Sequence, residues 1–413
     1  MRAKLKHLRY LGIALCAAAI GALYTLRLSF PPEPYYDEVY YVQFLHNLMY
    51  GHTIDYVSSH PPLWSLLAWP CVALWGDRSA IWRMVSLLAG LLLLPAVYAL
   101  TKKITRDSLV AACAVFFLAL DCISFTQARI AMFNSLSLLF MVLSLWMFLP
   151  SPAQPTRPRS RAMLGAGVFL GLALGAKLSS SSMFLIIYFL LMLEIMKNPA
   201  KRKALCCQGL LFLLILPLAI YVAVHAFIPL LPGYSWKSVW EIQKFNLAYH
   251  LKEAATQTHL YASPWWGWPL MMRPIWYYFA SKDGVVNGIL CIGNPAIFWM
   301  LPAMAAYLLW DWLRHKSKES GLILLGFFGQ WLFYALGARL KFFHYIYFAM
   351  PFAAIGLAWL CVRAWTQGKT GKLVVCAYVA LVVGMFLYWF PLLSGMPIPE
   401  KYYQQHMWFP AWI

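Results

Sequence analysis

Long apolar runs separated by short polar segments make up most of the chain. A helix needs about 20 apolar residues to cross the hydrocarbon core of a bilayer. Eleven runs approach that length, near 10–28, 80–100, 108–126, 129–149, 162–178, 180–196, 204–228, 289–311, 321–337, 342–363 and 373–393. The run at 63–76 is shorter, so we interpret it as a re-entrant or surface helix. The pattern predicts an all-α polytopic membrane protein with about 11 transmembrane helices.

Two polar segments are much longer than the other connections. One covers residues 29–79, and the other covers residues 229–288, which are rich in Trp, Tyr and Pro. No low-complexity tract or internal repeat marks a second unit. We therefore predict a single integral membrane domain over residues 1–413, with no soluble accessory domain.

The basic residues predict the orientation of the chain. More than half of the 33 Lys and Arg residues lie at the N-terminus or in short turns near 102–106, 157–161, 197–203, 314–318 and 363–372. Because basic turns remain in the cytoplasm, we place the N-terminus there and both long segments and the C-terminus outside. This arrangement predicts a multi-pass protein of the plasma (inner) membrane with an external or periplasmic active site.

Composition supports the membrane interpretation. Hydrophobic residues make up 62% of the chain and charged residues 11%, whereas a soluble domain carries about 25% charged residues. The net charge of +19 follows from the basic turns, so it does not indicate a nucleic-acid partner. The nine Cys lie mostly in apolar runs, and the His residues show no ligand spacing with a carboxylate, so we predict no metal and no cofactor.

Asp37 and Glu38 are adjacent carboxylates directly after the first predicted span, in a chain with only 14 acidic residues. A carboxylate at a membrane surface is a candidate general base. Asp37 would be the base, and Glu38 would orient the acceptor or raise the basicity of Asp37 through like-charge proximity. The alternative is that Asp37 only caps a helix over residues 38–50.

Cationic residues recur on the same predicted side, where the charge bias should make them rare. A cluster that neutralises a phosphate explains them better than anchors at helix ends do. The candidates for binding a donor phosphate or sugar are Arg129, Lys177, Arg273, Arg339, Lys341 and His344. His60, Tyr41 and Trp268 are candidates for positioning the acceptor or the loops, although His60-Pro61-Pro62 also suits a rigid turn.

Together these residues suggest transfer of a group carried on a lipid phosphate. A sugar on a polyprenyl phosphate already has a good leaving group, so cations that hold the departing phosphate replace a general acid. A base is still needed to take the proton of an acceptor hydroxyl. One carboxylate and a set of cations are therefore sufficient for this chemistry.

The ordered motifs resemble the protein O-mannosyltransferase family, which are polytopic glycosyltransferases of the GT-C class. In chain order the similar segments are DEVYY at 37–41, HPPL at 60–63, FLALD at 117–121, ARIAM at 128–132, GAK at 175–177, SPWWGWPL at 263–270, RPIWYY at 273–278, GNP at 293–295, FHY at 343–345 and PLLSGMPIP at 391–399. These segments are spread along most of the chain, from residue 37 to residue 399.

The resemblance implies that mannose passes from polyprenyl-phosphate mannose to Ser or Thr hydroxyls of proteins, with inversion at the anomeric carbon. It implies Asp37 as the base and Arg129 with nearby cations on the lipid phosphate. It also implies eleven spans, with the N-terminus inside and the C-terminus outside, and a metal-independent reaction. The expected partners are the lipid-linked donor, the acceptor and membrane lipids.

Two positions depart from the family pattern. Asn134 stands where the pattern has Asp, and Trp64-Ser65 stands where it has Gly-Lys. The inserted β-trefoil of eukaryotic members is absent, so the chain resembles the compact prokaryotic type. The missing lysine leaves open a related GT-C enzyme that transfers another sugar, such as an aminoarabinose-like unit, to lipid A or another glycolipid. A transporter or lipid flippase is the alternative of another class, but no internal repeat supports it.

Overall fold

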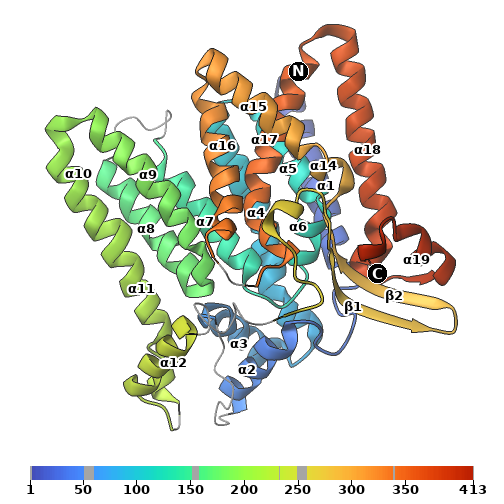
Figure 1. The fold of residues 1–413 in the computed structure, drawn as a ribbon, viewed down its shortest axis with the longest axis horizontal. Coiled ribbons are helices and arrows are strands. Elements are labelled where there is room, and N and C mark those ends of the chain that lie inside the picture. Colours follow the sequence, from blue (N-terminus) through green and yellow to red (C-terminus); the bar gives the residue numbers. More distant parts are fainter. Residues whose placement is uncertain are drawn as a thin grey trace.

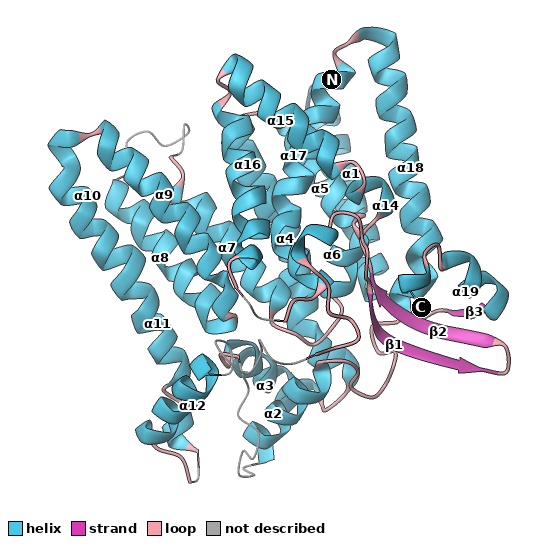
Figure 2. Ribbon diagram, in the orientation of Figure 1, coloured by secondary structure: helices cyan, strands magenta, loops and turns pink. Residues whose placement is uncertain are grey.

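The computed structural model describes residues 2–50, 60–150, 158–231, 233–248, 258–337 and 340–412. Most of these residues are helical (Figures 1 and 2). The first helices are α1 (Arg2–Thr25), α2 (Glu38–Tyr50), α3 (Leu63–Trp75), α4 (Ser79–Thr105), α5 (Ser108–Ala119), α6 (Cys122–Gln127), α7 (Asn134–Phe148), α8 (Arg159–Ala176) and α9 (Ser181–Lys197). They are followed by α10 (Arg202–Gln208), α11 (Leu216–His225), α12 (Trp236–Ala248), α14 (Pro295–Phe298), α15 (Leu301–His315), α16 (Lys318–Trp331), α17 (Met350–Trp365), α18 (Gly368–Ser394) and α19 (Glu400–His406).

The long helices run alongside one another, and their connections gather at two ends (Figure 1). Helices α2, α3 and α12 lie at one end. The basic α9–α10, α15–α16 and α17–α18 turns lie at the other end, together with the N-terminus. This common placement agrees with the charge pattern, while the assignment of that end to the cytoplasm stays a prediction.

The helical membrane fold is confirmed. Within the described residues, six helices are long and apolar enough to cross a membrane: Ser79–Thr105, Leu178–Lys197, Pro199–Leu230, Pro295–His315, Phe343–Trp365 and Gly368–Ser394. Shorter apolar helices cover Ala14–Thr25, Leu63–Trp75, Ser108–Ala119 and Asn134–Phe148. The predicted total of about 11 spans stays a prediction.

A small sheet corrects the expectation of an all-helical chain. Strands β1 (Ile275–Lys282) and β2 (Val285–Cys291) form an antiparallel hairpin, and β3 (Pro397–Pro399) pairs with β2 (Figure 2). The turn is Asp283-Gly284, with φ angles of 52° and 73°. Two positive φ angles suit a tight hairpin turn, which Asp-Gly favours. The predicted span at 289–311 therefore begins as a strand, and its helical part starts at α14.

The predicted span at 129–149 is also interrupted. Helix α6 ends at Gln127 and α7 begins at Asn134, so residues 128–133 form a buried turn between them. Ser86 of α4 provides hydrogen-bond partners for the backbone of this turn. Its hydroxyl donates to the Met132 carbonyl at 2.7 Å and accepts from the Met132 N–H at 3.2 Å. Non-helical backbone within a membrane-spanning region is tolerated where it is buried inside the protein, as it is here.

Glycines on α8 bring it close to the helical segment 202–225. Gly167, Gly171 and Gly175 recur every four residues, so they share one face of the helix. A Cβ atom on Gly167 would lie 1.7 Å from the Phe212 carbonyl oxygen, and one on Gly171 would lie 2.7 Å from Ile220. Small residues at this spacing permit close packing between membrane helices.

One carbonyl joins distant parts of the chain at the end that holds α2. The Gly395 oxygen accepts hydrogen bonds from Arg27 Nη2 at 2.8 Å and from Asn287 Nδ2 at 3.1 Å. Gly395 has a φ of 72°, and a Cβ atom there would lie 2.3 Å from the Phe30 ring. Glycine is therefore required for this junction between the end of α1, β2 and the segment after α18.

Candidate active site

The chain turns sharply at Tyr36, directly before the two carboxylates. Tyr36 has a positive φ of 51° and stacks on Tyr277 of β1, with 4.4 Å between ring centroids. After this turn Asp37 is half-buried at the start of α2, whereas Glu38 is fully buried. The adjacent carboxylates therefore occupy different environments.

Glu38 is held inside by Arg83, which projects from α4. Arg83 Nε donates to Glu38 Oε1 and Arg83 Nη2 donates to Glu38 Oε2, both at 2.9 Å. Oε1 also accepts the Ala131 N–H at 2.6 Å, and Oε2 accepts the Tyr35 N–H at 3.4 Å. Burial raises the pKa of Glu38, whereas the Arg83 guanidinium and the backbone N–H groups oppose this rise. Glu38 thus connects the first long polar segment to α4 and to the buried turn at 128–133.

Asp37 lies within electrostatic reach of two tyrosines. Burial first, and the negative charge of Asp37 second, raise the pKa of Tyr36 well above its usual value. Burial is also the main cause of the raised pKa of Tyr277, and Asp37 adds to it. Both phenols therefore stay protonated at neutral pH.

A hydrogen-bonded chain leads from Lys177 to this turn. Lys177 Nζ donates to Asn134 Oδ1 at 2.7 Å, and Asn134 Nδ2 donates to Gln127 Oε1 at 2.8 Å. Gln127 Nε2 then donates to the hydroxyl of Tyr277, whose ring stacks on Tyr36. Buried polar networks of this kind fix the positions of their members.

Lys177 is only 3% exposed and lies among aromatic rings. Its Nζ is 5.1 Å from the centroid of Phe133, 4.9 Å from that of Tyr345 and 5.0 Å from that of Phe348. Ring faces attract the ammonium but do not neutralise it. Asn134 contributes an amide oxygen where the family pattern has a carboxylate, so this partner adds no negative charge.

His60 and Tyr41 form a further aromatic wall beside Phe133. The ring centroids of His60 and Phe133 are 4.3 Å apart, and those of Tyr41 and Phe133 are 4.9 Å apart. Trp64 lies behind this wall, where its Nε1 donates to Ser86 Oγ at 3.1 Å. The tryptophan that departs from the family pattern therefore fills the interior and joins α3 to α4.

Arg129 and Trp268 lie inside the protein. Arg129 is 5% exposed, donates to the Tyr24 carbonyl of α1 and has its guanidinium carbon 4.7 Å from the Phe125 ring centroid. Trp268 donates from Nε1 to Ser263 Oγ at 3.0 Å. Trp268 thereby fixes the loop that precedes β1.

The remaining candidates lie near β1 and α17. His344 is buried edge-on to Tyr36, with ring centroids 6.3 Å apart. Arg273 and Lys341 are half-buried, and Lys341 Nζ donates to the Gly337 carbonyl at 2.5 Å. Arg339 lies outside the described residues. The structure thus brings His344 and Asp37 to the same tyrosine, Tyr36.

Sequence reasoning missed Arg83, Gln127 and Tyr277. Arg83 had a usable signal, because a cation inside an apolar run requires a buried partner. Gln127 had a weaker signal of the same kind, and the contacts of Tyr277 depend on the hairpin. In the resulting site, hydrogen bonds and ring stacking connect the buried cation Lys177 to the turn that carries the half-buried Asp37. Within the described ranges, no group of three or more His, Cys, Asp or Glu side chains is placed to hold a metal ion.

Two family models match consecutive parts of the chain. Residues 77–228 match the model described as dolichyl-phosphate-mannose-protein mannosyltransferase. Residues 235–412 match the C-terminal four TMM region of protein-O-mannosyltransferase. A polyprenol-phosphate-mannose–protein mannosyltransferase of Mycobacterium tuberculosis is 24% identical over 476 residues, covering 97% of this chain and 90% of the relative.

Solved structures share the fold. The Saccharomyces cerevisiae protein O-mannosyltransferase Pmt1-Pmt2 complex bound to the sugar donor aligns with a TM-score of 0.84 at 13% identity, covering 98% of this chain and 92% of that chain. ArnT from Cupriavidus metallidurans bound to undecaprenyl phosphate aligns with a TM-score of 0.66 at 13% identity, covering 93% of this chain and 77% of that chain.

Proposed function

Because this chain belongs to the dolichyl-phosphate-mannose-protein mannosyltransferase family, we propose that it transfers mannose from polyprenyl-phosphate mannose to Ser or Thr hydroxyls of proteins. The predicted class, a membrane glycosyltransferase, is confirmed by the family assignment. The donor and acceptor follow the name of the mycobacterial relative, which spans nearly the whole chain.

In the proposed reaction Asp37 is the general base. The acceptor oxygen attacks the anomeric carbon as the bond from that carbon to the phosphate oxygen breaks, and polyprenyl phosphate leaves. The hydroxyl proton passes to Asp37, and attack opposite the leaving group inverts the anomeric centre. The half-buried position of Asp37 at the start of α2 supports this role, because a base needs access to substrate.

Glu38 then serves as a positioning residue. Its oxygens accept four N–H groups, two from Arg83 and one each from Tyr35 and Ala131. This arrangement replaces our first interpretation, in which Glu38 orients the acceptor or acts on the basicity of Asp37. Glu38 holds the turn that presents Asp37.

Lys177 is the proposed contact for the departing phosphate. It is buried, it donates to the amide oxygen of Asn134, and hydrogen bonds connect it to the Asp37 turn. A fixed cation that stabilises the negative charge on the leaving group lowers the barrier. We assign His344, Arg273, Arg339 and Lys341 to the donor, as the sequence predicted, and Arg129 to positioning α1 against α6.

The site is proposed to face the exterior of the plasma membrane. Helices α2 and α3 lie at the end opposite the basic turns (Figure 1), and Asp37 directly precedes α2. Since basic turns favour the cytoplasm, the Asp37 end is external. The likeness to ArnT concerns the fold alone, so it gives no reason to prefer a glycolipid acceptor.

The test is a transfer assay with purified protein, radiolabelled polyprenyl-phosphate mannose, and either Ser/Thr-rich peptides or membrane lipids as acceptors. We expect label in peptide with the wild type and loss of transfer in Asp37→Asn. Glu33→Gln is the matched control, because Glu33 is an exposed acid of the same segment. Near-normal turnover of Asp37→Asn would rule out the base role, and label only in lipid would overturn the protein acceptor.

A further inference from the structure

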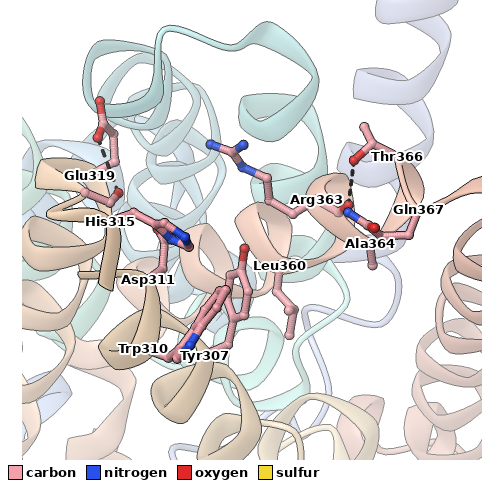
Figure 3. Close-up of a pocket in the computed structure, with 11 residues that line it drawn as sticks. Tyr307, Trp310, Asp311, His315, Glu319, Leu360, Arg363, Ala364, Thr366 and Gln367 are labelled. Carbon is pink, nitrogen blue, oxygen red and sulfur yellow. Dashed lines mark hydrogen bonds and ion pairs between the residues drawn. The ribbon is translucent and has the colours of Figure 1, made fainter. Parts of the chain in front are cut away.

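A cavity of about 660 Å³ lies at the end of the molecule opposite α2. It is formed by the end of α15, the turn into α16 and the end of α17, and Figure 3 shows its lining side chains. None of these residues takes part in the proposed transfer reaction. The cavity is therefore separate from the proposed active site, and its role is independent of the proposed function.

One wall of the cavity is a fixed set of polar groups. Asp311 Oδ1 lies 3.1 Å from His315 Nδ1, and Asp311 Oδ2 accepts the Ser320 hydroxyl at 2.5 Å. Asp311 is buried, and its two oxygens position the side chains of His315 and Ser320. His315 is thereby oriented by Asp311. Glu319, whose Oε2 accepts the Ser317 hydroxyl at 3.4 Å, adds a carboxylate to the same wall.

The opposite wall carries a cation. Arg363 extends from α17 toward the side on which His315 and Glu319 lie (Figure 3). Its guanidinium carbon lies 4.5 Å from the Trp359 ring centroid, which supports the side chain from behind. Thr366 and Gln367 continue this wall, where the Thr366 hydroxyl donates to the Arg363 carbonyl at 2.7 Å and Gln367 adds an amide. The Arg363 guanidinium and the Gln367 amide are donors that suit a phosphate group.

The floor of the cavity is aromatic. Tyr307 and Trp310 lie below the charged walls (Figure 3), and Trp310 is 53% exposed. Tryptophan and tyrosine at helix ends mark the level of lipid headgroups. Their ring faces also attract ammonium groups. The cavity therefore lies where a headgroup is found, and it offers partners for both signs of charge.

We propose that this cavity binds the headgroup of a zwitterionic phospholipid that carries a phosphodiester and a primary ammonium group. Arg363 and Gln367 receive the phosphate, while Glu319 and the aromatic floor receive the ammonium. The facing charges favour this headgroup over a purely anionic one, because Glu319 would repel a second negative charge. Free inorganic phosphate would use only the Arg363 wall.

Native mass spectrometry of the full-length purified protein tests the assignment. The probes are dioctanoyl phosphatidylethanolamine, dioctanoyl phosphatidylglycerol and inorganic phosphate. Arg363→Gln should weaken binding of the ethanolamine lipid about tenfold, the loss expected for one charged hydrogen-bonded contact. Glu319→Gln should weaken the ethanolamine lipid severalfold, but it should leave the glycerol lipid unchanged or bound more tightly.

Lys369→Gln is the matched control, because Lys369 is an exposed cation of the same end that does not line the cavity. It should leave ethanolamine-lipid binding unchanged, and all three variants should unfold thermally like the wild type. The proposal is overturned if the ethanolamine lipid does not bind or binds equally to wild type and both cavity variants. Tighter binding of the glycerol lipid to the wild type, or equal binding of inorganic phosphate, would also overturn it.

Discussion

Glu38→Gln should destabilise the protein, although it preserves the size of the side chain. The carboxylate accepts four N–H groups, of which Arg83 Nε and the Ala131 N–H share Oε1 while Arg83 Nη2 and the Tyr35 N–H share Oε2. Glutamine retains one oxygen and replaces the other with a donor. Two buried N–H groups then face an amide nitrogen, each at a cost of about 1–3 kcal/mol.

The loss of charge adds to this cost, because the Arg83 guanidinium is left in the interior without its counter-ion. Removing one member of a buried ion pair costs about 3–5 kcal/mol, so we expect a loss of that size. Arg83→Met should cost a similar amount, because it leaves the buried Glu38 carboxylate without its counter-ion. The double variant should be less damaging than the sum of the two by about 2 kcal/mol, as expected for contacting residues.

The assay is equilibrium unfolding in mixed micelles titrated with denaturing detergent, followed by tryptophan fluorescence and paired with transfer measurements on the same samples. Asp37→Asn is the companion variant, and it should lose transfer while retaining stability. Our reasoning would be refuted if Glu38→Gln unfolded like the wild type but lost transfer, since that result would give Glu38 a chemical role.

Three further predictions test other parts of the structure. Lys177→Gln should raise the KM for the donor about tenfold in steady-state assays, because it removes the proposed contact with the phosphate; an unchanged KM would remove Lys177 from the phosphate. Gly167→Ala should destabilise by about 1–3 kcal/mol, because its Cβ would meet the Phe212 carbonyl. Gly384→Ala is its control, since nothing lies within 4 Å of a Cβ atom there, and equal stability of the two would contradict the close packing. Treatment with EDTA should leave transfer unchanged, because fixed cations stabilise the leaving phosphate in our mechanism; inhibition that is reversed by a divalent cation would contradict it.

The sequence predicted the helical membrane fold because hydrophobic length and basic turns are local signals. It did not predict the hairpin at Asp283-Gly284, because the apolar residues of β2 merge with those of the following helices into one run. Nor could it predict that Asp37 is half-buried whereas Glu38 is fully buried. Their different burial depends on the left-handed turn at Tyr36 and on Arg83, which is 45 residues away from Glu38.

The polar chain from Lys177 to Tyr277 was beyond sequence analysis for a related reason. Asn134 was recognised only as a departure from the family pattern, and its contact with Lys177 spans 43 residues. The contact between Gln127 and Tyr277 spans 150 residues. Such pairings arise from packing and leave no periodic signal along the chain.

The hydrogen bond from Arg27 to the Gly395 carbonyl joins residues 368 positions apart. During synthesis at the ribosome, the end of α1 is inserted long before Gly395 exists. The Arg27 guanidinium must therefore be held by water or lipid headgroups until α18, which precedes Gly395, has entered the membrane. The junction of α1, β2 and the segment after α18 is consequently a late event in biogenesis, and a stalled or shortened chain would leave this surface open to quality-control proteases.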